Sequence, residues 1–424
     1  MADTRWSTSI DPTDRLVIPH MSTPFPKSSP KSLTIALAHD WLVARRGGEL
    51  VLDAIAAHLL NSGHRITTIY TMFDSGDPIT PAIDAIERTT SSLNRLPKPL
   101  RRWLLPRYPK AVEQLTRSLH ADHQKRPIDL LISTSSAAIK ALAPPDGVPH
   151  LCYCHAPARY LWSQADQYTT QPGIKSKLRA MGLDHFGDRL RNWDQRTASN
   201  VTQFIANSHF IANQIRDTYQ RDAVVIHPPV RTDYFTPPPN KTNDSSSRNN
   251  RLLYVGAIEP YKRVDLAIEA ALLLDRPIDI AGSGSHLSTL KRIYKNNPLI
   301  RFHGHANDPQ VLAFFRTNQV LLQPQIEDFG ITAVEAQSCG LPVVARRAGG
   351  SLDSIIESKT GAFFDHPDST ELADAIDRFT EGSYTADNCR SNSLRFSYEA
   401  FTTKLDAAIN STLDETPPNQ STGN

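Results

Sequence analysis

The same pattern of strand, loop and helix runs along the chain twice, first from residue 33 and again from residue 252. In both parts, short apolar runs rich in β-branched residues alternate with stretches of helical periodicity. Strands separated by helices form a parallel sheet with right-handed crossovers. The sequence therefore predicts an α/β protein with two Rossmann-like domains that face each other across a cleft.

The apolar runs indicate where the strands lie. In the first part we expect strands at Leu33–Leu37, Ile66–Met72, Leu130–Ser133, His150–Cys154, Phe204–Ala206 and Ala223–His227. In the second part we expect strands at Leu252–Val255, Ile278–Ala281, Arg301–His303, Val320–Leu322 and Pro342–Ala345. Ligands bind outside the carboxyl ends of the strands in such sheets, so two facing sheets can each supply half of one site.

Changes in composition set the domain boundaries. Residues 236–250 read TPPPNKTNDSSSRNN, which is typical of a surface loop or linker. The first 30 residues are rich in Ser, Thr and Pro, and the last residues are polar, as in loose termini. We expect a disordered arm over 1–30, a Rossmann-like N-terminal domain over 31–230, a linker over 231–250 and a Rossmann-like C-terminal domain over 251–393. A helix over 394–413 should cross back to the N-terminal domain, and a disordered tail should follow over 414–424.

Composition excludes several other classes of protein. The 46 basic and 44 acidic side chains nearly balance, which argues against a protein dedicated to nucleic acid. No stretch approaches the roughly 18 apolar residues that a membrane-spanning helix needs. Four cysteines in 424 residues do not make a disulfide framework, and the first residues lack a signal-peptide core. We therefore expect a cytoplasmic protein with reduced thiols.

The segment QPQIEDFGITAVEAQSC over residues 323–339 carries most of the chemistry. Glu327 and Glu335 stand eight positions apart, and a helical pattern begins near Ile331. The free N–H groups at such a helix start suit a diphosphate, and Gly330 lets the backbone approach it closely. Carboxylates accept hydrogen bonds only, so Glu335 suits a ribose diol and Glu327 a second hydroxylated ring.

This segment resembles the E-x7-E signature of retaining glycosyltransferases of family 4, which have the two-domain GT-B fold. AHDWLVARRGGE, CYCHAPARYLW, FIANSHFIANQI, VIHPPV, YVGAIEPYKRVDLAIEA and IAGSGSHL resemble the same family in the same order, from about Leu33 to Phe401. The HDWL…GGE and YCHxPxRYxW pair further resembles bacterial mannosyltransferases of O-antigen and exopolysaccharide assembly. The resemblance implies transfer of a hexose with retention of configuration.

On the donor side, the resemblance assigns Lys262 to the diphosphate, where positive charge stabilises the leaving group. The commoner family pattern has an arginine where this sequence has Ala257, so we expect Arg263 to substitute for it. Gly282 and Gly284 resemble the glycine turn beside the nucleotide base. We also count Phe329, Gly330, Ile331 and Glu335 as donor-binding residues.

On the other side of the cleft, Gly47 and Gly48 let backbone N–H groups approach a phosphate or the acceptor. His155 ends an apolar strand and can donate to a hydroxyl of the transferred sugar or assist the acceptor. Asp40 ends the first strand and is a candidate ligand of the acceptor hydroxyl. We take His155, Glu327 and Lys262 as the catalytic residues, with same-face attack as the mechanism that the family implies.

Metal ligands are not expected. Cys152, Cys154 and His155 alternate on a strand and so point to opposite faces. The pairs His303 with His305 and His120 with His123 lack the further ligands that zinc requires. The sequence also lacks an Asp-x-Asp pair of the kind that holds a divalent cation in the other major glycosyltransferase fold. We therefore expect a metal-independent enzyme without a cofactor, whose co-substrate is a nucleotide sugar, with GDP-mannose as the expected donor.

Between Arg95 and Arg126 lie nine basic and two acidic residues, with Trp103, Leu104, Leu105 and Tyr108 interleaved. Such a surface suits docking on an anionic bilayer, or it is a solvated helix with its apolar side in the core. With the lipid-linked acceptors of the resembling subgroup, it suggests peripheral contact with the inner face of the cytoplasmic membrane. Two alternatives stay open, namely a UDP-sugar donor and a non-catalytic saccharide- or membrane-binding scaffold with the same fold.

Overall fold

The computed structural model describes residues 32–44, 47–97, 104–162, 186–239, 248–380 and 384–415. The expected arm over 1–30, residues 240–247 of the expected linker and residues 416–424 of the expected tail lie outside these ranges. Both sheets belong to one compact unit, Leu33–Asn424.

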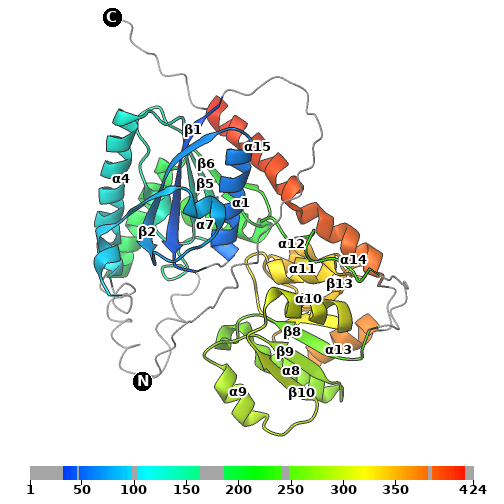
Figure 1. Ribbon diagram of the computed structural model, residues 1–424. Helices are drawn as coiled ribbons and strands as arrows, with labels where there is room; N and C mark the ends of the chain where they lie inside the picture. Colours follow the sequence, from blue (N-terminus) through cyan, green and yellow to red (C-terminus); the bar gives the residue numbers. More distant parts are fainter. Residues whose placement is uncertain are drawn as a thin grey trace, which may run out of the picture. The chain divides into compact units, whose positions relative to one another are not determined.

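The first sheet has seven parallel strands in the order β3-β2-β1-β4-β5-β6-β7. They are β1 Thr34–Leu42, β2 Arg65–Asp74, β3 Glu87–Thr90, β4 Leu130–Ser135, β5 His150–Cys154, β6 Gln203–Ala206 and β7 Ala223–Val225. The helices between them include α1 Gly47–Asn61, α2 Pro81–Asp84, α4 Tyr108–Lys125 and α7 His209–Tyr219. Helix α4 covers one face of this sheet, and α1 lies on the other face (Figure 1).

The second sheet has six parallel strands in the order β10-β9-β8-β11-β12-β13. They are β8 Leu252–Val255, β9 Ile278–Ala281, β10 Ile300–Gly304, β11 Val320–Gln323, β12 Val343–Arg346 and β13 Gly361–Phe364. The helices that follow are α8 Val264–Leu273, α9 Leu287–Ile293, α10 Asp308–Thr317, α11 Ile331–Ser338, α12 Ser351–Ser354, α13 Ser369–Thr380, α14 Ala386–Ser393 and α15 Tyr398–Asp414. Two parallel α/β sheets confirm the predicted fold class.

Central strands are easy to predict because helices bury both of their faces, which makes the strand a continuous apolar run. Every residue of β4 and β5 is buried, for example. The sequence analysis missed two strands at the sheet edges. β3 reads ERTT and has only β2 beside it, so it needs no apolar run, and β13 is the short GAFF at the other sheet's edge.

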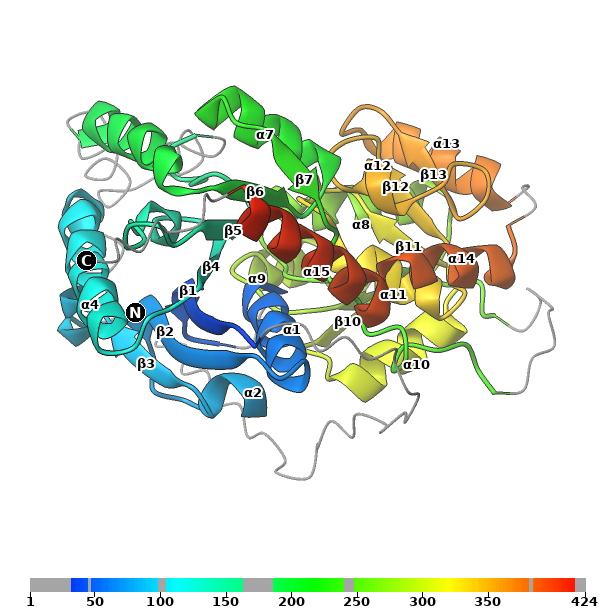
Figure 2. The same cartoon turned by 90° about the horizontal axis from the view of Figure 1, so that it is seen from above.

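The final helix, α15, packs on the first sheet although it follows the second sheet in the chain. Phe401, Leu405 and Ile409 belong to the same buried cluster as Ile35 of β1 and Ile55 of α1. Figure 2 shows α15 passing from α11 and α14 toward β5 and β6. The helix therefore ties the carboxyl end of the chain to the first domain.

Candidate active site

The loop between β11 and α11 holds the first half of the E-x7-E segment. The carbonyl of Glu327 accepts a hydrogen bond from the N–H of Gly350 at 2.8 Å, so the loop rests against the turn after β12. Helix α11 begins at Ile331, directly after Gly330. Gly330 has φ +89°, and a Cβ added there would lie 2.8 Å from Nε2 of the buried Gln323. Only glycine fits this backbone without strain.

Glu327 is paired with the lysine that the sequence assigns to the donor diphosphate. Lys262 Nζ lies 2.5 Å from Glu327 Oε1, and Gln325 Nε2 donates to the same oxygen at 2.8 Å. Lys262 ends a short 3-10 helix, Pro260–Lys262, in the turn before α8. The structure thus brings Lys262 and Glu327 together, and it adds Gln325, which the sequence analysis did not single out.

Glu335 lies inside α11 and faces an arginine from the segment that leaves the first sheet. Arg231 Nη2 lies 3.5 Å from Glu335 Oε1, and Arg231 also forms a short ion pair with Asp308 at the start of α10. Burial raises the pKa of Glu335 to about 7, and Arg231 opposes this only in part because it is shared with Asp308, whose charge adds to the rise. Glu335 is therefore a carboxyl group that changes its charge near neutral pH.

Arg263, which the sequence analysis expects to replace the arginine missing at Ala257, pairs with an acidic residue of the helix that it precedes. Its backbone is left-handed, with φ 52°, and its Nη2 donates to Asp265 Oδ2 at 3.0 Å. The side chain is thus engaged with the first turn of α8. The expectation that Arg263 faces the diphosphate is not supported by this geometry, which leaves Lys262 as the cation paired with the motif's first glutamate.

The start of α1 lies close to both α11 and His155. A Cβ on Gly47 would be 3.6 Å from Cδ1 of Ile331, and a Cβ on Gly48 would be 3.5 Å from Nε2 of His155. Among the residues that the structure describes, this buried Nε2 atom has no hydrogen-bond partner. Burial, with the charges of His39 and Arg159, lowers the pKa of His155 to about 3, so the imidazole is neutral. A neutral ring with an unused nitrogen suits contact with a hydroxyl group.

Asp40 has a structural role in this geometry. It is 1% exposed, and its two carboxylate oxygens accept hydrogen bonds from the hydroxyl of Ser135 and from four successive backbone N–H groups, those of residues 136–139. Both oxygens are thus engaged in holding the loop after β4. Direct contact of Asp40 with an acceptor finds no support here, and we leave Asp40 out of the proposed site.

Three other donor-side predictions fall on tightly packed positions. Phe329 is 3% exposed and packs with Val230, Val334 and Phe396, so its ring is part of a core. A Cβ on Gly282 would lie 1.8 Å from the carbonyl oxygen of Gly256, and one on Gly284 would lie 2.2 Å from that of Ile258. These glycines are required by close backbone packing, and their contact with a nucleotide base stays a prediction.

A second ion pair joins the first domain to the loop between β11 and α11. Arg159, which follows β5 in the first domain, forms a short ion pair with Asp328, the residue after Glu327. The sequence analysis quoted both motifs but did not assign Arg159, Asp328 or Arg231 a role. Opposite charges on distant segments give no periodic signal, so such pairs are visible only once the fold is known.

The basic segment Arg95–Arg126 is described only in part, because residues 98–103, with Trp103, lie outside the described ranges. Lys110, Arg117 and Lys125 are exposed on α4. Tyr108 is 2% exposed and packs in the core, which agrees with the alternative of a solvated helix whose apolar side lies in the core. Among the described helices, none is both long and apolar enough to cross a membrane.

Two family models match adjoining parts of the chain. The model described as Glycosyltransferase Family 4 matches residues 45–234, and the model described as Glycosyl transferases group 1 matches residues 240–396. The D-inositol 3-phosphate glycosyltransferase of Arthrobacter sp. is 25% identical over 357 residues, which are 78% of this chain and 81% of that protein. The protein of the same name from Geodermatophilus obscurus is 27% identical over 294 residues, covering 61% of this chain and 64% of that protein.

Solved structures show the same fold. Sucrose-phosphate synthase from Thermosynechococcus elongatus superimposes with a TM-score of 0.69 at 17% identity, covering 90% of this chain and 99% of that one. Anabaena HepE in complex with UDP gives a TM-score of 0.64 at 17% identity, covering 89% of this chain and 99% of that one. With both family models in place on two parallel α/β sheets, the chain is a glycosyltransferase of family 4 type with the GT-B fold.

Proposed function

We propose that the protein transfers a hexose, mannose from GDP-mannose, to a saccharide or lipid-linked saccharide acceptor with retention of configuration. The observation that carries the proposal is the Lys262–Glu327 pair, 2.5 Å apart, in the loop that leads into α11. One cation and one carboxylate are thus held where a sugar diphosphate meets the free N–H groups of a helix start.

The pairing of Lys262 with Glu327 keeps both charges partly shielded from water. The side chains are only 16% and 24% exposed, so neither charge is fully hydrated. When a diphosphate arrives, its oxygens replace Glu327 as the partner of the ammonium group. The carboxylate is then released toward the hydroxyls of the sugar, held in place by Gln325. Charge that develops on the leaving diphosphate is met by Lys262 and the start of α11.

The first domain contributes His155 to the same proposal. Its unpartnered Nε2 faces the backbone of Gly48, and its neutral form can both donate and accept a hydrogen bond. We assign it to a hydroxyl of the transferred sugar or of the acceptor. In this proposal no protein side chain acts as the nucleophile, and the leaving phosphate takes the acceptor's proton.

Donor choice has a second candidate. HepE of Anabaena, which shares the fold, was solved with UDP, so a UDP-sugar is the specific alternative to GDP-mannose. The two sequence relatives reported above are D-inositol 3-phosphate glycosyltransferases, which keeps a phosphorylated polyol among the acceptors to be tested.

The test is a thermal-shift and donor-hydrolysis panel with GDP-mannose, UDP-glucose, UDP-N-acetylglucosamine and GDP-fucose, each with and without EDTA. A donor that binds the folded state raises the melting temperature by mass action. We expect GDP-mannose to do so with EDTA present, and Lys262→Met and Glu335→Ala to abolish the shift. Lys291→Met, an exposed lysine on α9, is the matched control and should keep it.

A UDP-sugar response would replace the donor but keep the reaction. Stabilisation by any donor that Lys262→Met leaves intact would refute the proposed diphosphate site. The absence of stabilisation and of hydrolysis with every sugar nucleotide would contradict the donor class itself.

The exposed cations of α4, of which Arg117 and Lys125 also pair with Glu113 and Asp122, lead to a further part of the proposal, peripheral contact with an anionic membrane that presents a lipid-linked acceptor. Each cation near such a surface adds about 1 kcal/mol to binding. The protein should co-sediment at low salt with vesicles that contain about 30% anionic lipid. A triple variant, Lys110→Gln, Arg117→Gln and Lys125→Gln, should bind these vesicles at least tenfold more weakly. Equal binding of the variant would refute the role of α4.

A further inference from the structure

A cluster of three ligand-type side chains lies apart from the proposed donor residues. His209 is the first residue of α7 in the first domain, His227 follows β7, and Asp353 lies in α12 of the second domain. Asp353 Oδ2 lies 3.1 Å from Nδ1 of His209 and 3.0 Å from Nε2 of His227. The three ligand atoms all lie within 4.8 Å of one another. In the described part of the chain, no other three histidine, cysteine or acidic side chains bring their ligand atoms this close together.

These three atoms are of the types that bind transition metals. Zinc takes imidazole nitrogen and carboxylate oxygen at about 2.0–2.2 Å, which places two ligands of a tetrahedral ion about 3.3 Å apart. The two distances to Asp353 Oδ2 are within a few tenths of an ångström of that spacing. Two imidazoles and one carboxylate leave the fourth position of the ion for water.

The carboxylate oxygen that would bind the ion is already the focus of the cluster. Asp353 Oδ2 lies within hydrogen-bond distance of the backbone N–H of His209 and of one ring nitrogen of each histidine, as suits an ionised carboxylate. The carboxylate side chain is only 7% exposed, and its two ion-pair partners are imidazoles, which are not permanent cations. A divalent cation would balance this buried charge.

The site is also both ordered and accessible. The ring of His227 packs at 5.3 Å from Phe329 and 5.1 Å from Phe396, measured between ring centres, which fixes its orientation. The backbone N–H of His209 donates to Asp353 Oδ2 at 2.8 Å, which orients the carboxylate. The side chain of His209 is 71% exposed, so an ion and its water ligand can enter from that side.

We infer that His209, His227 and Asp353 form a binding site for a divalent transition-metal ion of the zinc class, separate from the nucleotide-sugar site. The ion would join the start of α7 to α12 and so link the first domain to the second. It takes no part in the transfer reaction, whose charges are met by Lys262 and α11. Donor binding should therefore survive removal of the ion.

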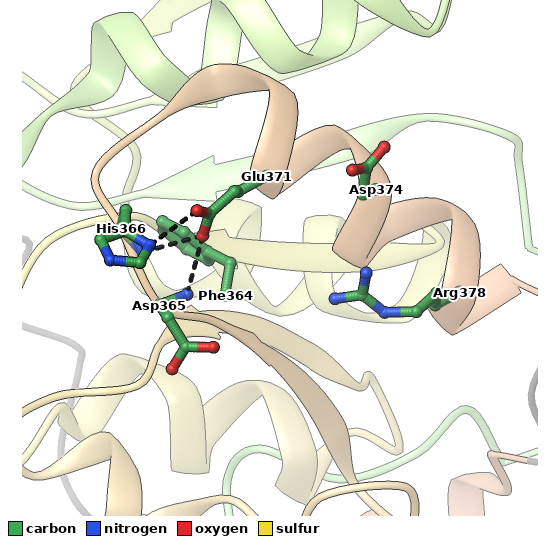
Figure 3. Close-up of a pocket in the computed structure, with 6 residues that line it drawn as sticks. All are labelled: Phe364, Asp365, His366, Glu371, Asp374 and Arg378. Atoms are coloured by element: carbon green, nitrogen blue, oxygen red, sulfur yellow. Dashed lines mark hydrogen bonds and ion pairs between the residues drawn. The ribbon is translucent and has the colours of Figure 1, made fainter.

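The chain provides a matched control for the imidazole–carboxylate geometry. In a surface hollow after β13, His366 Nδ1 lies 2.7 Å from Glu371 Oε1, with Asp365, Asp374 and Arg378 around it (Figure 3). This pair has no third ligand of the required type in reach among the described residues, and Arg378 brings a positive charge to the hollow. A histidine–carboxylate pair by itself should not hold an ion tightly.

The experiment uses untagged full-length protein, stripped with chelator and titrated with zinc against a chromophoric indicator. We expect one tightly bound zinc per chain and a rise in melting temperature with zinc. Asp353→Asn keeps a side-chain oxygen for the two histidines but removes the charge, and His209→Ala changes an exposed ligand. Loss of a group that only hydrogen-bonds to a metal ligand weakens metal binding by roughly 10- to 100-fold. Loss of a ligand itself should weaken zinc binding by more than this in each variant.

His366→Ala should bind zinc as the wild type does. Three results would overturn the inference: no stoichiometric zinc binding by the stripped protein, unchanged binding in Asp353→Asn and His209→Ala, or loss of binding in His366→Ala. Circular dichroism and stabilisation by a sugar nucleotide show whether each variant is folded. A failure of the proposed donor would leave the zinc titration unaffected, so the two proposals are tested separately.

Discussion

The affinity for a sugar nucleotide should rise steeply with pH around neutrality, because the proposed ribose ligand Glu335 has a pKa raised to about 7. A carboxylate accepts hydrogen bonds from two hydroxyls, whereas its protonated form gives up part of that capacity. If only the charged form binds, the apparent dissociation constant is the intrinsic one divided by the charged fraction. That fraction is about one tenth at pH 6 and nine tenths at pH 8, so affinity should improve about tenfold.

The change is large enough to separate a raised pKa from an ordinary one. A glutamate with the usual pKa near 4.5 is fully charged over this range and would give a flat profile. A sugar nucleotide is the better ligand for the assay, because its diphosphate is esterified at both ends and does not titrate near neutral pH. Calorimetric titration of GDP-mannose, or of whichever donor the panel selects, from pH 5.5 to 8.5 measures the midpoint directly.

Two neighbours of Glu335 should move that midpoint in opposite directions. Arg231→Met removes the cation that favours the charged carboxylate, so the midpoint should rise, and Arg231→Lys should restore it in part. Asp308→Asn removes a negative charge that disfavours the charged form of Glu335, so the midpoint should fall. A flat profile in the wild type, or a midpoint that neither variant moves, would refute the argument.

The free protein should show the opposite trend in stability. A carboxyl group whose pKa is raised on folding binds its proton more tightly when folded, so its contribution to stability is complete at low pH and is lost as pH rises through about 7. For this buried group the difference amounts to about 3 kcal/mol between pH 4 and pH 8. Glu335→Gln should therefore stabilise the free protein at pH 8 in urea unfolding while it weakens donor binding, and unchanged stability would count against the raised pKa.

Three further predictions concern the frame of the site. Asp40→Ala leaves several buried N–H groups without an acceptor and should cost about 3 kcal/mol in urea unfolding; a cost below 0.5 kcal/mol would contradict its structural role. In Gly330→Ala, the added Cβ would stand on a left-handed backbone and against the amide of Gln323, so the free energy of unfolding should fall by about 1–2 kcal/mol. The variant should also lose the rise in melting temperature on donor binding. A full rise would argue against close approach of the backbone to the diphosphate. Arg263 has a left-handed backbone, which costs a residue with a side chain about 1 kcal/mol, and Arg263→Gly removes this cost. The variant also loses a partly exposed ion pair that stabilises the protein by less, so its melting temperature should rise slightly. A lower melting temperature would refute this balance.

The sequence predicted the repeated sheets well because buried parallel strands read as apolar runs, as in β4 and β5. It failed at β3, whose polar ERTT sequence suits an edge strand. The positions of Gly330 and Ile331 were also predictable, since a glycine before an apolar helical pattern indicates a special backbone at a helix start. Side-chain direction was not predictable, so the sequence did not show that Arg263 pairs with Asp265 or that Phe329 packs with Phe396.

Two residues that the sequence analysis missed, Arg159 and Arg231, share one physical feature with the predicted Lys262. Each acidic residue of the E-x7-E segment is held by a cation from a distant part of the chain, Lys262 for Glu327, Arg159 for Asp328 and Arg231 for Glu335. Two of these cations, Arg159 and Arg231, belong to the first domain or to the segment that leaves it. Removing one partner of a partly buried pair leaves the other charge exposed to the full cost of desolvation. The acidic residues of the E-x7-E segment therefore need cations from outside the second domain. In the proposal, the first domain thus contributes to the donor side of the site as well as to the acceptor side.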